Sequence, residues 1–219
     1  MPINVETKNK KCIRLYITRH GKTIMNQMCL FQGSTDSPLN EIGLAATKAL
    51  KKRLESISFD AVYVSPLGRT IETYKQIKSP LMPEMEIREN LKELDFGIME
   101  NTLIDEASKL WPESFESLYN NPENHVPVEG MESISSFSDR VNKELYSILD
   151  RHTKEQVLII THGVVMRAMM LQFEKRNLSD FWVDDYIPST SLIVVDFDGE
   201  DFIIIKKFDN EHTAHITDV

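Results

Sequence analysis

Two basic residues stand directly after an apolar run near the start of the chain, in the stretch LYITRHGKT, where Arg19 and His20 follow the run. Arg69 lies a few residues beyond a second apolar run, DAVYVS, and His162 follows a third, QVLIIT. Arginine binds phosphoryl oxygens in a bidentate manner and stays charged at every relevant pH. A histidine can donate to phosphate or attack phosphorus through a neutral ring nitrogen. Taken singly, such residues are more often structural, but together they predict phosphoryl-transfer chemistry.

A carboxylate suited to exchange a proton with a leaving group occurs in the stretch LKELDFG, where Glu93 is flanked by Leu91, Leu94 and Phe96. Partial burial and a bound phosphate would both favour its protonated form, so Glu93 is a candidate acid and, later, a candidate base for water. Asp95 is a competing candidate in the same stretch. An ordinary loop carboxylate is the structural alternative.

The elements that would position these residues alternate between strand and helix patterns. Apolar, β-branched runs predict strands, and apolar residues at helical spacing predict helices. The Asp198-Gly199 pair predicts a hairpin turn, and Asn40 is suited to cap a helix. The predicted strands span residues 12–18, 60–65, 156–161, 190–197 and 202–208, and the predicted helices span residues 41–57, 69–78, 133–152 and 164–173.

This alternation predicts an α/β fold, a three-layer sandwich in which helices flank a mostly parallel central β-sheet. The length of 219 residues suits a single domain spanning residues 1–219. Ligands of open parallel sheets bind beyond the carboxyl ends of the strands. Because Arg19, His20, Arg69 and His162 all follow predicted strands, we expect them to meet in one crevice.

Four motifs in this order resemble those of the histidine phosphatase superfamily, in its phosphoglycerate mutase-like branch. They are RHGKT from Arg19 with Asn26 and the Gln32-Gly33 pair, SPLGRT from Ser65, ELDFG from Glu93, and THG from Thr161. The resemblance implies a phosphoglycerate mutase-like fold and assigns the catalytic roles. By this resemblance His20 is phosphorylated, Glu93 is the proton donor, and Arg19, Arg69 and His162 hold the phosphoryl group.

The same resemblance implies a pocket around the substrate and also shows where this chain departs from the family. The implied substrate-binding residues are Thr23, Asn26, Gln32 and Gly33, with backbone amides at Gly163 and Val164. The family's frequent Trp-Glu-Gly is Met99-Glu100-Asn101 here, its Gly-Gly-Glu-Ser is GMES, and the late Pro-Asn-x-Ser has Ser189 in place of asparagine. These departures affect the substrate assignment and leave the five catalytic positions intact.

Residues 95–128 are expected to form a lid-like segment over the site, and its charge bears on the reaction. The segment is acidic and has Lys109 as its only strong base, whereas a mutase needs cations there to retain a doubly anionic substrate. We therefore expect a phosphoric monoester hydrolase of the histidine acid phosphatase type, acting on a small ester with an apolar or weakly polar organic part. The aromatic residues available near the entrance, or for packing of the lid, are Phe31, Phe96, Trp111, Phe115 and Tyr119.

Two other functions remain open, a cofactor-dependent phosphoglycerate mutase and a non-catalytic protein that binds a phosphate ligand. Retention of both His20 and Glu93 argues against the second. No cofactor or metal is expected, because the strand-end residues are cations and no His-Glu-x-x-His motif or Gly-rich phosphate loop occurs.

The composition excludes several other classes of protein. A formal net charge of −9 argues against nucleic-acid binding, and no apolar segment is long enough to span a membrane. Cys12, expected in a buried strand, and Cys29 are predicted to be free thiols. We expect a cytoplasmic protein whose partner is a small phosphomonoester, and the sequence leaves the oligomeric state open, a homodimer included.

Overall fold

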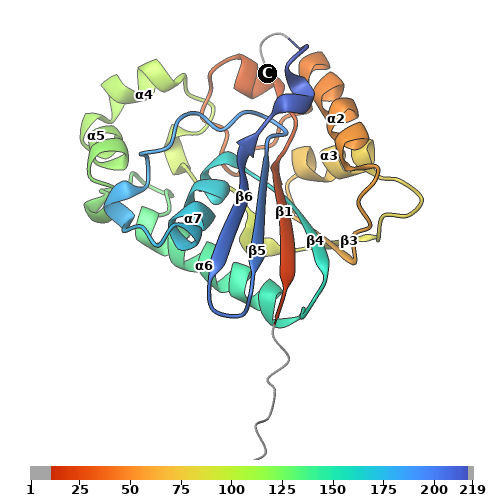
Figure 1. Cartoon of the computed structure of the whole chain (residues 1–219). Helices are drawn as coiled ribbons and strands as arrows, with labels where there is room; N and C mark the ends of the chain where they lie inside the picture. Colours follow the sequence, from red (N-terminus) through yellow and green to blue (C-terminus); the bar gives the residue numbers. More distant parts are fainter. Residues whose placement is uncertain (1–10, 217–219) are drawn as a thin grey trace, which may run out of the picture.

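A six-stranded sheet forms the centre of the protein, shown in Figure 1 as a computed structural model that describes residues 11–216. The strands lie in the order β3-β2-β4-β1-β5-β6. Their bounds are β1 Ile13–Arg19, β2 Ala61–Val64, β3 Met85–Ile87, β4 Gln156–Thr161, β5 Leu192–Phe197 and β6 Phe202–Asp209.

The sheet is mixed, with one strand running against the others. β1 pairs with β4, β4 with β2, and β2 with β3 in the parallel sense. β5 is antiparallel to β1, and β6 is antiparallel to β5, so β5 alone runs in the opposite direction. The predicted mostly parallel sheet and the predicted hairpin are confirmed. The register pairs Arg19 with Thr161, which brings the ends of β1 and β4 together.

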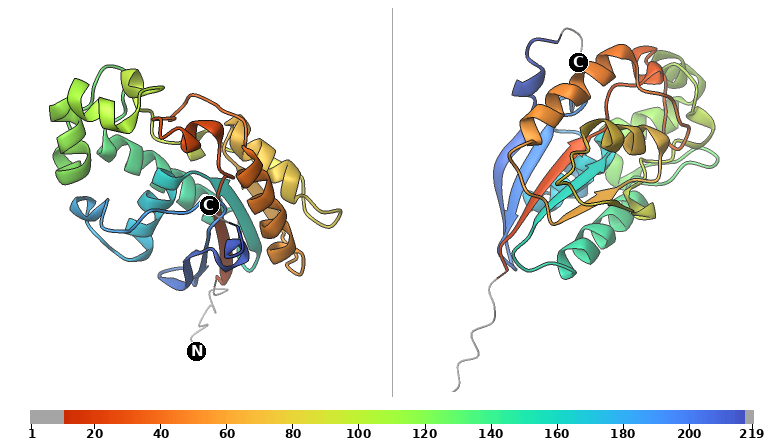
Figure 2. Two further views of the ribbon diagram at one scale, coloured as in Figure 1. Left: turned by 90° about the horizontal axis from the view of Figure 1, so that it is seen from above. Right: turned by 90° about the vertical axis from the view of Figure 1, so that its right-hand side faces the viewer.

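Helices cover both faces of the sheet and complete three layers (Figure 2). On one face, α2 and α3 pack Leu50 and Ile77 against Val64 and Ile160. On the other face, α6 and α7 contribute to a second apolar cluster with the opposite sides of β1 and β4. The helices are α1 Ile24–Gln27, α2 Glu41–Leu54, α3 Gly68–Ile77, α4 Ile104–Leu110, α5 Pro112–Asn120, α6 Ile134–Asp150 and α7 Gly163–Phe173. Short 3-10 turns are η1 Glu89–Leu91, η2 Gly97–Met99, η3 Pro122–Asn124, η4 Leu178–Asp180 and η5 Glu211–Thr213.

Local sequence explains where the long helices begin. Asn40 caps α2, because its side-chain oxygen accepts a hydrogen bond from the amide of Gly43 at 2.8 Å, as predicted. Ser133 caps α6 in the same way through the amide of Ser136 at 3.1 Å. α7 begins at Gly163, immediately after His162 at the end of β4. The N-terminus of α7 therefore opens at the carboxyl edge of the sheet.

The structure corrects two details of the expected layout. Cys12 does not lie in a buried strand: β1 begins at Ile13, and Cys12 is exposed at its entry. Cys29 is also exposed, and both cysteines are free thiols as predicted. The strand β3 and the helices α4 and α5 were not predicted; they are short, with three, seven and nine residues.

The segment 95–128 forms η2, α4, α5 and η3, and the two helices lie on the side of the molecule away from α2 and α3 (Figures 1 and 2). The ring of Phe115 meets the edge of Phe31 at 6.4 Å, and the indole nitrogen of Trp182 donates to the carbonyl of Leu118 at 2.5 Å. Within residues 11–216, no helix is long and apolar enough to cross a bilayer.

Candidate active site

Four of the predicted catalytic side chains converge beyond the carboxyl ends of β1, β4 and β2. Arg19 ends β1, His20 follows it, and the ring of His20 lies 5.2 Å, between centroids, from the ring of His162 after β4. Arg69 stands in the first turn of α3 and donates from Nε to Nε2 of His20 at 3.2 Å. All four are buried. The four side chains that the sequence predicts to meet therefore do lie together.

His20 is held in the state that a nucleophile requires. Its Nδ1 lies 2.8 Å from the carbonyl oxygen of Gly21. Because a carbonyl only accepts, Nδ1 carries the proton and Nε2 keeps a lone pair, which accepts from Arg69. Burial, followed by the charges of Arg69 and Arg19, holds the pKa of His20 well below 6.5. The ring is neutral at physiological pH.

Three buried donors in this region have no hydrogen-bond acceptor among the described residues. They are Nε of Arg19, Nδ1 of His162 and Nε2 of Gln32. Leaving buried polar groups unpaired costs about 1–3 kcal/mol each, and more for a charged group. A Cβ atom on Gly163 would lie 3.5 Å from Nε of Arg19, so the open donor faces the N-terminus of α7. Phosphoryl oxygens would satisfy such donors.

The loop after α1 fixes Arg69 from the other side. Its Nη2 donates to the carbonyl of Gly33 at 2.7 Å, and its Nη1 donates to the carbonyl of Thr35 at 3.0 Å. The carboxylate of Asp36 accepts from the same Nη1 at 3.4 Å and from the backbone amide of Arg69 at 3.2 Å. Burial lowers the pKa of Arg69 below its ordinary value, and the carboxylates of Glu93 and Asp36 oppose that shift.

The side chains of His162 and Arg19 are held in place by other residues. The hydroxyl of Ser65 lies 2.7 Å from Nε2 of His162, so its O–H can donate there and leave a proton on Nδ1. Burial and the charge of Arg69 hold the pKa of His162 well below 6.5. Arg19 donates from Nη1 to the carbonyl of Ile187 at 2.5 Å, and its guanidinium lies 5.2 Å from the ring centre of Tyr186.

Glu93 has the environment expected of a carboxylic acid. It is buried, and burial raises its pKa above 4.5. Its oxygens accept from the amides of Leu94 at 3.1 Å and Val164 at 3.2 Å, and the Val164 bond is the largest of the effects opposing that rise. Since the Val164 amide serves Glu93 here, its role toward a substrate stays a prediction.

The predicted substrate-binding residues form a linked group beside His20. The Thr23 hydroxyl donates to Oε1 of Gln32 at 3.0 Å and accepts from the amide of Asn26 at 3.1 Å. The side chain of Asn26 accepts from the amide of Thr23 at 3.2 Å, which completes the cap of α1. Because Thr23 occupies the oxygen of Gln32, the amide nitrogen of Gln32 is left for another acceptor. Gly33 adopts a φ of +51°, and a Cβ there would lie 2.1 Å from Oε1 of Glu100.

Sequence reasoning missed several residues that support the site. Glu100 accepts from the backbone amides of Ser34 at 2.7 Å and Thr35 at 2.8 Å, and Asp36 accepts from the amides of Gly68 and Arg69. Ser65 orients His162. Ser65 lies in the SPLGRT motif, Glu100 lies in the Met99-Glu100-Asn101 stretch, and Asp36 lies three residues after the Gln32-Gly33 pair. Proximity to a motif was therefore the only available signal, because the backbone contacts depend on the fold.

The aromatic residues of the acidic segment pack in a row. Phe31 lies 4.7 Å from Phe96 between ring centres, Phe115 lies 4.9 Å from Tyr119, and Tyr119 lies 4.9 Å from Trp182. Burial raises the pKa of Tyr119 to about 12. Of the two interpretations of these rings, packing of the segment fits the structure better.

Comparisons with known proteins identify the family of this chain. The histidine phosphatase superfamily (branch 1) matches residues 15–210. The chain belongs to the histidine phosphatase superfamily. Within it, phosphoserine phosphatase 1 of Hydrogenobacter thermophilus is 31% identical over 170 residues, covering 78% of this chain and 80% of that protein.

Two solved structures share this fold. YhfR of Bacillus stearothermophilus has a TM-score of 0.86 and 34% identity, over 91% of this chain and 98% of that chain. A phosphoglycerate mutase from Bacillus anthracis has a TM-score of 0.78 and 26% identity, over 94% of this chain and 97% of that chain. The predicted family and the phosphoglycerate mutase-like α/β fold are confirmed, and the relatives support a phosphatase acting on phosphate esters.

Proposed function

We propose that this protein is a metal-independent phosphatase that hydrolyses a small organic phosphomonoester through a phosphohistidine at His20. The observation that carries the proposal is the neutral Nε2 of His20 beside buried donors that have no acceptor among the described residues. Such a site is complementary to an anion with several oxygens next to a nucleophile. The arginines supply positive charge that a metal ion supplies in other phosphatases.

In the first step, Nε2 of His20 attacks phosphorus, and the bond from phosphorus to the ester oxygen breaks. The electron pair of that bond goes to the leaving oxygen, which takes a proton from Glu93. Nε of Arg19, Nδ1 of His162 and the amide of Gln32 donate to the phosphoryl oxygens. The Nε–H of Arg69 that contacts Nε2 in the structure is placed to donate to one of these oxygens instead.

In the second step, the carboxylate of Glu93 takes a proton from water as the water oxygen attacks phosphorus. The phosphorus–nitrogen bond breaks, its electrons return to Nε2, and phosphate leaves. The buried setting that raises the pKa of Glu93 favours its return to the acid form for the next cycle. His20 ends neutral, with its Nδ1 proton still bonded to Gly21.

The relatives and the acidic segment guide the choice of substrate. A phosphoserine phosphatase is among the relatives, so phosphoserine is the first ester to test. The segment 95–128, as a lid, would oppose bisphosphates, because its acidic side chains outnumber Lys109. A phosphoglycerate mutase is the second candidate, favoured by the similarity to the Bacillus anthracis structure.

A single screen in the presence of EDTA tests the proposal. Purified protein is incubated with phosphoserine, sugar phosphates, nucleotides and 3-phosphoglycerate, and both free phosphate and mutase product are measured. We expect phosphate release that EDTA leaves intact and that His20→Ala abolishes, and a radiolabelled phosphoryl group on wild type that survives alkali but not acid. Mutase product without free phosphate would support the second candidate, and near-normal hydrolysis by His20→Ala would refute the phosphohistidine.

A further inference from the structure

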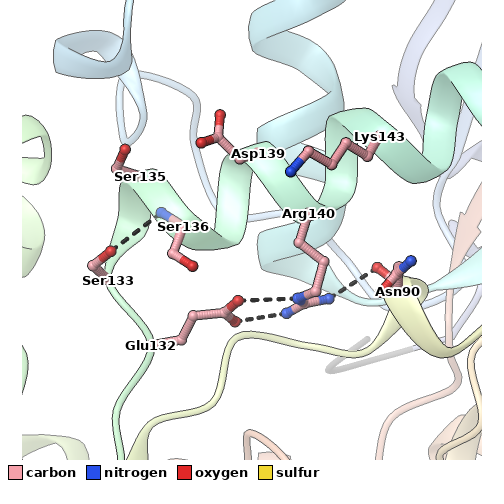
Figure 3. A pocket seen from close by; sticks show the side chains of 8 residues that line it. All are labelled: Asn90, Glu132, Ser133, Ser135, Ser136, Asp139, Arg140 and Lys143. Atoms are coloured by element: carbon pink, nitrogen blue, oxygen red, sulfur yellow. Dashed lines mark hydrogen bonds and ion pairs between the residues drawn. The ribbon is translucent and has the colours of Figure 1, made fainter.

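One arginine outside the phosphate site donates hydrogen bonds to several backbone carbonyls around Glu93. Arg140, on α6, donates from Nη1 to the carbonyls of Asn90 at 2.8 Å and Lys92 at 3.0 Å. Its Nη2 donates to the carbonyl of Glu93 at 3.3 Å. Its Nε and Nη2 also donate to the two carboxylate oxygens of Glu132 at 3.0 and 2.7 Å (Figure 3). One guanidinium therefore binds three carbonyls within four consecutive residues.

The Glu132 carboxylate fixes the plane of that guanidinium. A bidentate pair allows little rotation of an arginine, and the ring of Phe137 lies beneath it at 4.9 Å. The backbone amide of Glu132 also donates to the carbonyl of Asp95 at 3.0 Å. The segment 90–95 is thus held at both ends by residues 132 and 140.

A second set of bonds holds the same segment from the sheet. The Thr161 hydroxyl, at the end of β4, donates to the carbonyl of Leu91 at 2.9 Å. The side chain of Glu93 accepts from the amide of Val164 in α7. The carbonyl of Glu93 is therefore bonded to Arg140 of α6, and its carboxylate is bonded to the amide of Val164 in α7. Both hydrogen bonds determine where the carboxylate lies.

The outer side of Arg140 is open. A cavity of about 530 Å³ is lined by Asn90, Glu132, Arg140 and the first turns of α6, as Figure 3 shows. Without the guanidinium, the carbonyls of Asn90, Lys92 and Glu93 would lose the donor that they have in the described structure. The segment would then lose three of the hydrogen bonds that hold it.

We propose that Arg140 is a positioning residue for Glu93 in the phosphatase reaction, an inference that rests on the proposed function. A displacement of about 1 Å at a reacting group can reduce a rate about 10²-fold. The effect should appear mainly where a proton must reach the leaving oxygen. Esters of 4-nitrophenol need little protonation, whereas esters of an aliphatic alcohol depend on the acid.

The test compares Arg140→Met, which removes all donors, with Arg140→Lys, which keeps the positive charge but loses the planar guanidinium that bonds several acceptors at once. Arg88→Met is the matched control, because Arg88 also pairs with α6, through Glu144, but donates to no carbonyl of residues 90–93. kcat/KM is measured on 4-nitrophenyl phosphate and on an aliphatic phosphomonoester. Arg140→Met should lose about 10- to 100-fold on the aliphatic ester and little on the nitrophenyl ester.

We expect Arg140→Lys to fall between wild type and Arg140→Met, and Arg88→Met to change both substrates equally. In a Glu93→Gln background, Arg140→Met should cause no further selective loss on the aliphatic ester, because both changes act through one group. Equal losses on the two esters in both Arg140 variants, or a selective loss that persists without Glu93, would overturn the proposal.

Failure of the proposal is distinguishable from failure of the proposed function. If the reaction itself were misassigned, His20→Ala would retain activity, and Glu93→Gln would slow both esters equally. If only the role of Arg140 were wrong, those two variants would behave as proposed. Urea unfolding of every variant identifies losses due to misfolding, and Arg140→Lys keeps the test decisive if Arg140→Met does not fold.

Discussion

Glu100 holds the loop that supplies two acceptors to Arg69, and replacing it tests that link. Its carboxylate accepts from the amides of Ser34 at 2.7 Å and Thr35 at 2.8 Å, and from the Thr35 hydroxyl at 2.5 Å. The carbonyls of Gly33 and Thr35 accept from Arg69 at 2.7 and 3.0 Å. The loop is thus fixed between the carboxylate of Glu100 and the guanidinium of Arg69.

Glu100→Gln keeps the size of the side chain but replaces one acceptor oxygen with an NH₂ group that only donates. In either orientation, the amide of Ser34 or of Thr35 loses its acceptor. A hydrogen bond to a charged group contributes about 1.5–3 kcal/mol, so the free energy of unfolding should fall by about that amount. If half of the loss is felt at Arg69, phosphate affinity falls about 3- to 12-fold.

Urea unfolding measures the first quantity, and competitive inhibition by inorganic phosphate measures the second. Glu106→Gln is the control, because Glu106 is an exposed glutamate of α4 in the same acidic segment. We expect the control to change neither value. A destabilised Glu100→Gln protein with unchanged phosphate inhibition would refute the idea that this loop positions Arg69, and unchanged stability would refute the contribution of the hydrogen bonds.

Three further predictions concern His162, two glycines and pH. Ser65→Ala removes the hydroxyl 2.7 Å from His162, and we expect about a 10-fold loss in kcat/KM, equivalent to about 1.4 kcal/mol. Gly97→Ala places Cβ 2.2 Å from a backbone oxygen, whereas Gly130→Ala meets one atom at 3.4 Å; both have positive φ, so urea denaturation should show the larger loss at Gly97. Because the pKa values of His20 and His162 are held well below 6.5, the folded protein binds fewer protons than the unfolded chain below that pH. Stability should therefore fall as the pH drops below 6.5, by at most about 1.4 kcal/mol per pH unit for each histidine.

Each of these has a result that would contradict it. Full activity in Ser65→Ala would show that His162 does not need the hydroxyl of Ser65 as a hydrogen-bond partner. Equal stability of Gly97→Ala and Gly130→Ala would show that the close contact of the Cβ atom at position 97 does not destabilise the protein. Glu93 opposes the pH effect: its pKa is raised above 4.5, so its contribution is present below pH 4.5 and is lost as the pH rises. Two histidines outweigh it, and a urea midpoint that stays constant from pH 7 to 5 would contradict the argument.

The proximity of the candidate catalytic residues was predictable because strand ends are visible in sequence and the carboxyl ends of parallel strands meet at one edge of the sheet. Arg19, His20 and His162 follow directly from that rule. Arg69 required the additional recognition of its motif, since it lies in the first turn of α3. The long helices α2 and α6 were predictable from their apolar period and their capping residues.

The supporting residues could not be predicted in the same way. Arg140, Glu100 and Asp36 act on backbone carbonyls and amides, and every residue type carries those groups, so no side-chain pattern identifies the partner. The same limit applies to β3, whose three residues pair with β2 only because the sheet extends there. The prediction that Cys12 lies in a buried strand was wrong, because the apolar run does not show at which residue the chain becomes exposed to solvent.

The strand β1, which ends at Arg19 directly before His20, lies inside the sheet, with β4 on one side and β5 on the other. To expose the β1 amides to exchange with deuterium, ladders on both sides must separate, and Leu15 and Ile17 must leave the apolar core. We therefore expect the β1 amides to exchange only through global opening of the domain. The proposed nucleophile, His20, directly follows one of the last parts of the molecule expected to open, so heat or urea should remove activity and native structure in one transition.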